Sequence, residues 1–274
     1  MKPIQYIDTT DIISDAQEII KFSKTETNSS NFKSSYFRAL NKIQELKFSY
    51  DENLVEPMLN FNVSGNEEKL VLATFGSQDN LDLNVNNCQF SKEEQTLIAE
   101  NWHKGLTLIK SFDLDLWNLV NTIDAQFLFA KTGSHLGGSF WYLIGVIWMS
   151  PKLDHWKPED YAENILHETI HQCMFLKDMV HTLFSKDITE LAQENALVKS
   201  AIREVDRPYD FAFHAATVSV ALVKFYEFLG NQDKADKFKT GSIETLAQLH
   251  EKQHLLSTKG KAVLVGMMAT LSLN

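Results

Sequence analysis

The short sequence HETIH, at residues 167–171, constrains the fold more than any other feature of the chain. Two histidines four residues apart project from the same face of a helix, one turn from each other. Glu168 follows His167 at about 100° around such a helix, so it can face a metal-bound water or support the ligands. We therefore predict a helix that binds a divalent metal through His167 and His171, with Glu168 as the catalytic carboxylate. The alternative is a pair of ordinary surface histidines.

The residues before this motif predict a strand followed by the metal helix. Residues 139–150 are dense in β-branched and aromatic side chains and lie between Gly137-Gly138 and Pro151, which is typical of a strand. A helical pattern then starts after Pro158 and passes through the motif to about Lys177. A strand, a turn and a metal helix in this order allow an edge strand to hold a peptide beside the metal.

The rest of the chain is predicted to be mostly helical, without an internal repeat or a linker. Apolar spacing and end signals predict helices at residues 11–23, 33–47, 91–112, 113–131, 188–203 and 212–229, and two more within 232–253. The sequence Ser91-Lys92-Glu93-Glu94 opens one of them as a capping box. Residues 24–35 are expected to form a loop, and residues 261–273 are ambiguous. We expect an α-rich α+β fold in one continuous domain, with a helical region at 1–132 and a metal-binding catalytic region at 133–274.

Composition limits the partners and the compartment. With 26 basic and 36 acidic residues the formal net charge is −10, which disfavours nucleic acid and anionic membranes as partners. The same charge fits a basic peptide, and it is also common in cytoplasmic proteins. The first twenty residues show no signal-peptide pattern, and no apolar run approaches the roughly 20 residues that span a bilayer. Two cysteines give no disulfide framework, so a cytoplasmic location is expected.

Two histidines leave the metal short of protein ligands, and the sequence offers two further candidates. The compact pattern with a third histidine six residues after the motif is excluded, because position 177 is lysine. Glu190 lies 19 residues after His171, a spacing found in zinc peptidases, where Glu168 would activate a metal-bound water. His214 lies at the start of a predicted apolar helix, where a histidine is unfavourable unless it has a hydrogen-bond partner or binds a ligand. The residues alone leave both candidates open.

A later segment resembles a known family. The segment SAIREVDRPYDFAFH, residues 200–214, is similar to the pattern of serine, arginine, Arg-Pro and histidine that follows HExxH in HExxH-motif peptide-modifying proteins, which are found beside ribosomally made, modified peptides. The segment GVIWMS, residues 145–150, resembles the strand before their metal helix. The resemblance covers roughly residues 133–230, and the Arg-Pro segment is its specific part. The matching positions are His167, Glu168, His171, Ser200, Arg203, Arg207, Pro208 and His214.

This resemblance implies an iron(II)- and 2-oxoglutarate-dependent peptide β-hydroxylase acting on a ribosomally synthesised precursor peptide. It implies a zincin-like core and His214 as the third iron ligand, since non-haem iron oxygenases use three protein ligands and keep positions open. It further implies that Arg203 or Arg207 holds the far carboxylate of 2-oxoglutarate, because a guanidinium matches a carboxylate in geometry. The alternative for these arginines is an exposed pair on a polar turn.

The chain also departs from the family pattern at two points. Phe211 and Phe213 stand where the family often has glycine and leucine, which changes the shape of the pocket. Three histidines differ from the usual set of two histidines and one carboxylate, so Glu190 stays open as a ligand. A zinc peptidase with His167, His171 and Glu190 as ligands is the main alternative function. A non-catalytic peptide-binding protein is the second alternative.

Overall fold

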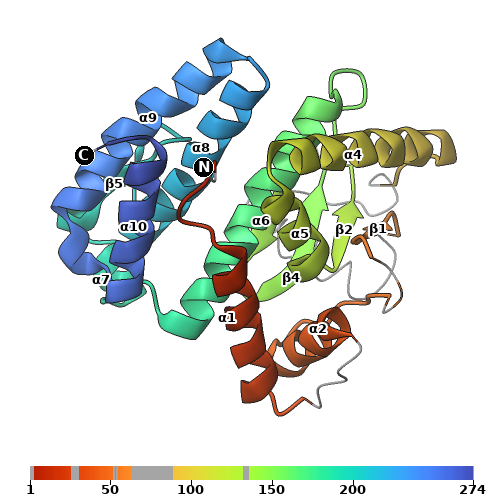
Figure 1. The fold of residues 1–274 in the computed structure, drawn as a ribbon, viewed down its shortest axis with the longest axis horizontal. Coiled ribbons are helices and arrows are strands. Elements are labelled where there is room, and N and C mark those ends of the chain that lie inside the picture. Colours follow the sequence, from red (N-terminus) through yellow and green to blue (C-terminus); the bar gives the residue numbers. More distant parts are fainter. Residues whose placement is uncertain are drawn as a thin grey trace. The chain divides into compact units, whose positions relative to one another are not determined.

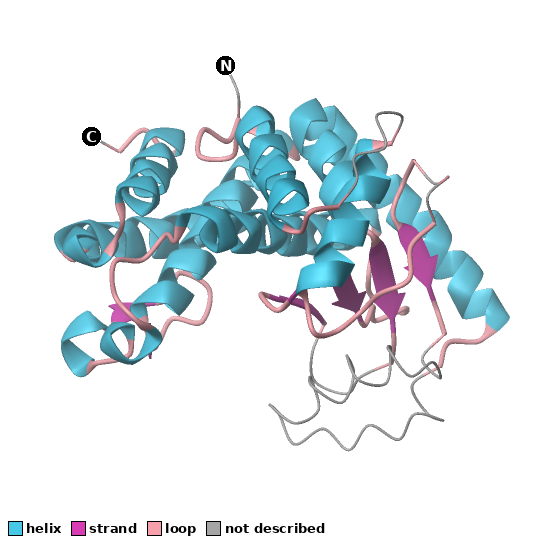
Figure 2. Cartoon of the chain, turned by 90° about the horizontal axis from the view of Figure 1, so that it is seen from below, coloured by secondary structure: helices cyan, strands magenta, loops and turns pink. Residues whose placement is uncertain are grey.

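The computed structural model describes residues 3–25, 31–51, 53, 55–62, 89–131 and 136–273. These residues are mostly helical, with a small mixed sheet, so the predicted α-rich α+β class is confirmed (Figure 2). They divide into two compact units, one of Ile13–Gln172 and the other of Met1–Ile12 with Cys173–Asn274. The predicted boundary between residues 132 and 133 lies outside the described residues. In the described part of the chain, no helix has the length and apolar character needed to cross a membrane.

Figure 1 labels most of the helices and strands of the described residues. Up to the metal helix they are α1 (Thr9–Phe22), α2 (Phe32–Ile43), β1 (Met58–Asn60), α4 (Lys92–Phe112), α5 (Leu114–Ile123), β2 (Gln126–Phe129), β3 (Gly137–Phe140), β4 (Leu143–Met149) and α6 (Pro158–His181). After it come α7 (Ile188–Leu191), β5 (Val198–Lys199), β6 (Asp206–Arg207), α8 (Tyr209–Phe228), α9 (Gln232–Glu251) and α10 (Thr258–Thr270).

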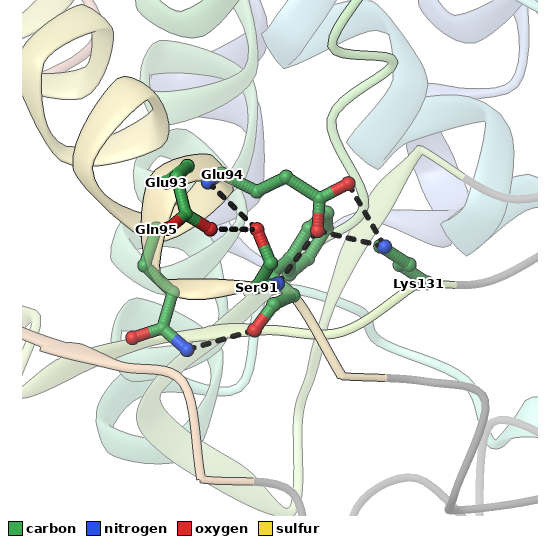
Figure 3. Close-up of polar contacts among 6 residues, drawn as sticks. Ser91, Glu93, Glu94, Gln95 and Lys131 are labelled. Atoms are coloured by element: carbon green, nitrogen blue, oxygen red, sulfur yellow. Dashed lines mark hydrogen bonds and ion pairs between the residues drawn. The ribbon is translucent and has the colours of Figure 1, made fainter.

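The predicted capping box opens α4 (Figure 3). The Ser91 hydroxyl accepts a hydrogen bond from the Glu94 backbone N–H at 3.2 Å, and the Glu94 carboxylate accepts one from the Ser91 N–H at 2.6 Å. The same carboxylate forms an ion pair of 2.8 Å with Lys131, just after β2. The Gln95 amide donates to the Phe90 carbonyl at 2.8 Å. The start of α4 is therefore fixed by the capping bonds between Ser91 and Glu94, which the sequence predicts.

The sheet has the order β1-β2-β4-β3. β1, β2 and β4 are parallel, and β3 is antiparallel to β4. The single strand predicted at 139–150 is wrong in one respect: the chain turns at Trp141 and Tyr142, so two strands replace one. Every residue of β4 is buried, which places β4 in the interior of the sheet and leaves β3 at the edge.

Three predicted helices end earlier than expected. The helix predicted through residue 131 stops at Ile123, and β2 follows, because the apolar run after it pairs with β1 and β4. α2 stops at Ile43 rather than near residue 47, because the Gln44 side chain instead bonds both the N–H and the C=O of Ile144. The helix predicted at 188–203 is limited to α7.

A β-hairpin replaces the rest of that third helix. β5 and β6 pair Val198 with Arg207, and the Ser200 N–H bonds the Val205 carbonyl at 2.9 Å. Glu204 has φ 58°, a left-handed turn conformation that ends helical periodicity. Residues 198–207 therefore form a hairpin that leads through Pro208 into α8.

The C-terminal helices largely follow the predicted pattern. α8 ends before Gly230, whose φ of 69° suits a residue without a side chain. A single helix, α9, occupies the range where two were predicted, and α10 occupies the ambiguous C-terminal range. α9 comes so close to the β5–β6 hairpin that a Cβ at Gly241 would lie 2.6 Å from the Ala201 carbonyl oxygen.

Candidate metal centre

Buried polar side chains fix the orientation of α6 on the sheet. The Gln172 amide accepts from the Gly145 N–H at 2.8 Å and donates to the Val146 carbonyl at 3.2 Å, which ties the helix to the start of β4. The Thr169 hydroxyl donates to the Asp124 carboxylate at 2.6 Å, just before β2. Because Thr169 lies between the two motif histidines, these bonds also set the direction in which the histidines project.

The structure brings the three motif residues together, as the sequence predicts. One potential ligand atom each from His167, Glu168 and His171 lies within 4.8 Å of the others. The two imidazole ring centres are 5.0 Å apart, and Glu168 Oε1 is 3.7 Å from His167 Nε2. The His167 side chain is 27% exposed and that of Glu168 only 7%. The imidazoles can therefore be reached by a ligand, while the carboxylate is held below the surface.

Ser139 on the edge strand holds Glu168. Its hydroxyl donates to Glu168 Oε2 at 2.8 Å, which leaves Oε1 on the side of His167. Burial raises the pKa of Glu168 to about 7, and the bond from Ser139 opposes that rise. A carboxyl group with a pKa near neutrality can both take up and release a proton. The sequence does not reveal this role of Ser139, because nothing in its spacing from the motif marks it as a partner of Glu168.

The donor set fits a transition metal of intermediate softness. Imidazole nitrogens and a carboxylate oxygen are ligands for iron(II) and for zinc, and they do not by themselves distinguish the two. One helix supplies all three groups, so further ligands would have to come from other parts of the chain or from small molecules. The three groups could therefore hold a metal ion.

The two candidates for the third ligand lie in the unit of Met1–Ile12 and Cys173–Asn274, whereas the motif belongs to the other unit. His214, in the second turn of α8, lies among aromatic rings, with its centre 5.1 Å from that of Phe175 and 6.3 Å from that of Phe184. Burial lowers its pKa to about 4, so the imidazole is neutral at pH 7. Glu190 forms an i, i+4 ion pair of 2.9 Å with Lys186 and is 40% exposed, as a surface glutamate would be.

The predicted cofactor-binding arginines lie close together at the β5–β6 hairpin. Arg207 is half-buried, with its guanidinium 4.8 Å from the ring centre of Phe211, whereas Arg203 is exposed. Burial and the neighbouring charge of Arg203 lower the pKa of Arg207, and the carboxylate of Asp210 opposes this. Within the described ranges, neither guanidinium has an ion pair. Glu204 and Asp206 lie on the same hairpin, but neither guanidinium is held in an ion pair among the residues that the structure describes, so either one can contact an anion.

Comparison with known proteins adds no family assignment for this chain. No model of a known protein family matches it, and neither does any curated protein.

Asp124, the partner of Thr169, is a second unusual carboxyl group beneath the site. It is completely buried, and burial raises its pKa to about 7 against the opposing effects of Thr169 and of the Lys33 charge. In the unfolded chain an aspartate titrates near pH 4, so the unfolded state loses this proton first as the pH rises. The contribution of Asp124 to stability is therefore complete below about pH 4 and is lost as the pH rises to about 7.

Asp124→Asn should remove this pH dependence while keeping an oxygen that accepts from Thr169. Between pH 5 and pH 8, the free energy of unfolding of the metal-free wild type should fall by roughly 2–3 kcal/mol relative to that of the variant, since one pKa unit corresponds to about 1.4 kcal/mol. Urea unfolding of both proteins at the two pH values measures this difference. If the free energies of unfolding of the wild type and the variant differ by the same amount at both pH values, the raised pKa of Asp124 would be contradicted.

Proposed function

We propose that this chain is an iron(II)- and 2-oxoglutarate-dependent peptide β-hydroxylase that acts on a ribosomally synthesised precursor peptide. The observation that carries the proposal is the grouping of His167, Glu168 and His171 on one helix, with its donor atoms within 4.8 Å. The resemblance of residues 200–214 supplies the reaction class. The cytoplasmic location predicted from the two cysteines belongs to the same proposal.

The arrangement of the sheet supports a zincin-like core. α6 directly follows β4 in the chain and is bonded to it through Gln172. The neighbouring strand β3 lies at the sheet edge, runs antiparallel to β4, and contacts the motif through Ser139. An HExxH helix beside an antiparallel edge strand allows an extended peptide to lie next to the metal ligands.

In this proposal His167, His171 and His214 hold the iron. When bound, iron(II) supplies the oxidising chemistry by which dioxygen and 2-oxoglutarate hydroxylate a carbon of the peptide. The overall reaction inserts one oxygen atom into a substrate C–H bond, and the other oxygen atom enters succinate as carbon dioxide is released. The assignment of His214 follows the Arg-Pro to His pattern. Its imidazole is neutral at pH 7, and the neutral imidazole is the form that binds a metal.

Arg207 is the proposed partner of the far carboxylate of 2-oxoglutarate. Its guanidinium is half-buried, so its attraction for an anion is screened less than that of the exposed Arg203. Phe211 packs against the guanidinium and restricts its motion, which favours a fixed bidentate contact. Arg203 adds a second positive charge nearby. A hydrolase has no use for such an arginine pair, so these residues favour the oxygenase over the peptidase.

Glu168 is assigned an orienting role rather than that of a base. Its Oε2 is bonded to Ser139 and its Oε1 faces His167, so the carboxyl group can hold a ligand or a bound water in place. The pKa near 7 that burial gives Glu168 also suits a general base, and this observation favours a zinc peptidase as the second candidate. In that alternative Glu190 replaces His214 as a ligand.

The products decide between the two functions. Pooled synthetic peptides should gain one oxygen atom in the presence of iron(II), 2-oxoglutarate and dioxygen, with formation of succinate, and Glu168→Gln should retain part of this activity. A peptidase should instead cleave the peptides with zinc alone. Its rate should fall on the order of 10²–10⁴-fold in Glu168→Gln. Mass spectrometry of the peptides reads out both results. Cleavage without oxygen insertion would contradict the hydroxylase.

The third ligand can be tested separately by metal affinity. We expect His214→Ala to weaken iron binding at least tenfold, because one of three protein ligands is lost. Glu190→Ala should change it less than twofold, because this side chain forms an exposed pair with Lys186. Equilibrium dialysis against iron(II) under anaerobic conditions measures both affinities. If Glu190→Ala weakens iron binding more than His214→Ala does, Glu190 would be the third metal ligand, which would favour the peptidase.

A further inference from the structure

We propose that the outer edge of β3 binds the substrate peptide as an added strand, and that Trp141 selects a large apolar side chain on it. The inference rests on the proposed function only for the class of substrate. Its geometry comes from β3, the turn after β3 and the side chain of Ser139, all within the unit of Ile13–Gln172.

The hydrogen bonds of β3 determine which of its backbone groups face outward. The Ser150 N–H bonds the Leu136 carbonyl at 2.8 Å, so the backbone of Leu136 faces β4. In an antiparallel pair the direction alternates, so Gly138 also faces β4, while the N–H and C=O groups of Gly137 and Ser139 point away from it. Of the strands in the described ranges, only β4 pairs with β3. A row of alternating donors and acceptors is matched best by another extended backbone.

The side chain of Ser139 relates this edge to the metal motif. Because its hydroxyl bonds Glu168, Ser139 projects from the face of the sheet that carries α6. Residues directly opposite each other on paired strands project from the same face. The peptide residue opposite Ser139 would therefore direct its Cβ towards the side of Glu168 and His167. Pairing along β3 thus selects which residue of the peptide is presented to the motif.

Glycine at the start of the edge allows a second chain to approach. Gly137 and Gly138 have no side chains to hinder a peptide backbone at the outer edge of β3. Ser139, the next residue, has its side chain engaged by Glu168. The edge therefore offers backbone hydrogen bonds with little side-chain obstruction, which suits binding through the main chain.

Trp141 forms an exposed aromatic surface directly after this edge. Its side chain is 67% exposed, yet it packs edge-on against Tyr142, with ring centres 5.4 Å apart. Tyr142 in turn stacks on Phe140, which is buried, at 4.9 Å. A tryptophan that is exposed but supported from beneath is well suited to cover an apolar side chain, and tryptophan is enriched among residues that dominate binding energy. Trp141 is therefore assigned as a specificity-determining residue for the peptide.

The test uses an immobilised array of nonapeptides with lysine at both ends, chosen to match the net charge of −10. The seven central positions carry leucine, phenylalanine or tryptophan one at a time among small residues. We expect the wild-type protein to bind those peptides of the array that carry the apolar residue at one preferred position. The tightest peptide is then resynthesised with each amide N-methylated in turn. Methylation should weaken binding tenfold or more at alternate positions only, since every second N–H of an added strand faces its partner.

Trp141→Ala should weaken binding of the tightest peptide at least tenfold and that of its alanine-substituted analogue less than twofold. Phe22→Ala, which removes a 77% exposed ring from α1, is the matched control and should change neither affinity. Retention of no peptide, sensitivity to methylation without alternation, or full affinity in Trp141→Ala would each overturn the inference.

The same measurement distinguishes this inference from the proposed function. Binding is measured with and without iron(II) and 2-oxoglutarate. Alternating peptide binding without any iron-dependent 2-oxoglutarate binding would support the β3 edge and contradict the hydroxylase. Iron-dependent 2-oxoglutarate binding in a protein that retains no peptide would support the hydroxylase and contradict the β3 edge.

Discussion

His167→Ala and His171→Ala should each yield folded protein that no longer holds stoichiometric metal and has no activity. Each change removes one of the two imidazoles that project from the same face of α6. The helix itself should persist, because alanine favours helices and because Gln172 and Thr169 keep α6 bonded to the sheet. Metal content by elemental analysis and helical content by circular dichroism measure the two expectations.

The matched control for these variants is His155→Ala, which removes an exposed histidine shortly before α6. It should leave both the metal content and the activity unchanged. Full metal occupancy in both His167→Ala and His171→Ala, with the same total as the control, would refute the metal centre.

Arg207→Ala should raise the KM for 2-oxoglutarate tenfold or more, with unchanged metal content. Removing one partner of a buried charge pair costs about 2–5 kcal/mol, which corresponds to at least this factor. Arg203→Ala should have a smaller effect, because Arg203 is exposed and its charge is screened by solvent. Arg207→Lys should restore only part of the affinity, because an ammonium group cannot meet both carboxylate oxygens at once.

Lys199→Ala provides a matched control on the same hairpin. Lys199 carries a positive charge, but it forms an ion pair of 2.9 Å with Glu244. Its removal should leave the KM for 2-oxoglutarate within twofold of the wild type. A wild-type KM in both arginine variants, or turnover that needs no 2-oxoglutarate, would refute the cofactor assignment.

The features that the sequence predicts well are those that depend on neighbouring residues. The capping box at Ser91 is formed by residues three positions apart, and Gly230 ends α8 through its own backbone freedom. The spacing of His167 and His171 is sufficient to bring the two rings within 5.0 Å, because one helical turn does this without any tertiary contact. Each of these features depends on only a few consecutive residues, so the sequence alone is enough to predict it.

The features that the sequence does not reveal depend on distant pairing. The apolar run of β2 fits a buried helix as well as a buried strand, and its partners β1 and β4 decide between them. The turn at Trp141 that separates β3 from β4 contains no glycine, proline or asparagine to mark it. Ser139 reaches Glu168 from 29 residues away. For the buried Asp124, the sequence shows only that it is the one charged residue between Asp115 and Lys131.

We propose that the motif holds iron for a reaction with 2-oxoglutarate. The most direct test of this proposal is metal analysis of protein purified without oxygen, followed by titration with 2-oxoglutarate. We expect one iron(II) per chain, and 2-oxoglutarate binding that appears only when iron(II) is present and is lost in His167→Ala. Protein that selectively retains zinc, and that binds no 2-oxoglutarate after it is loaded with iron(II), would contradict the claim.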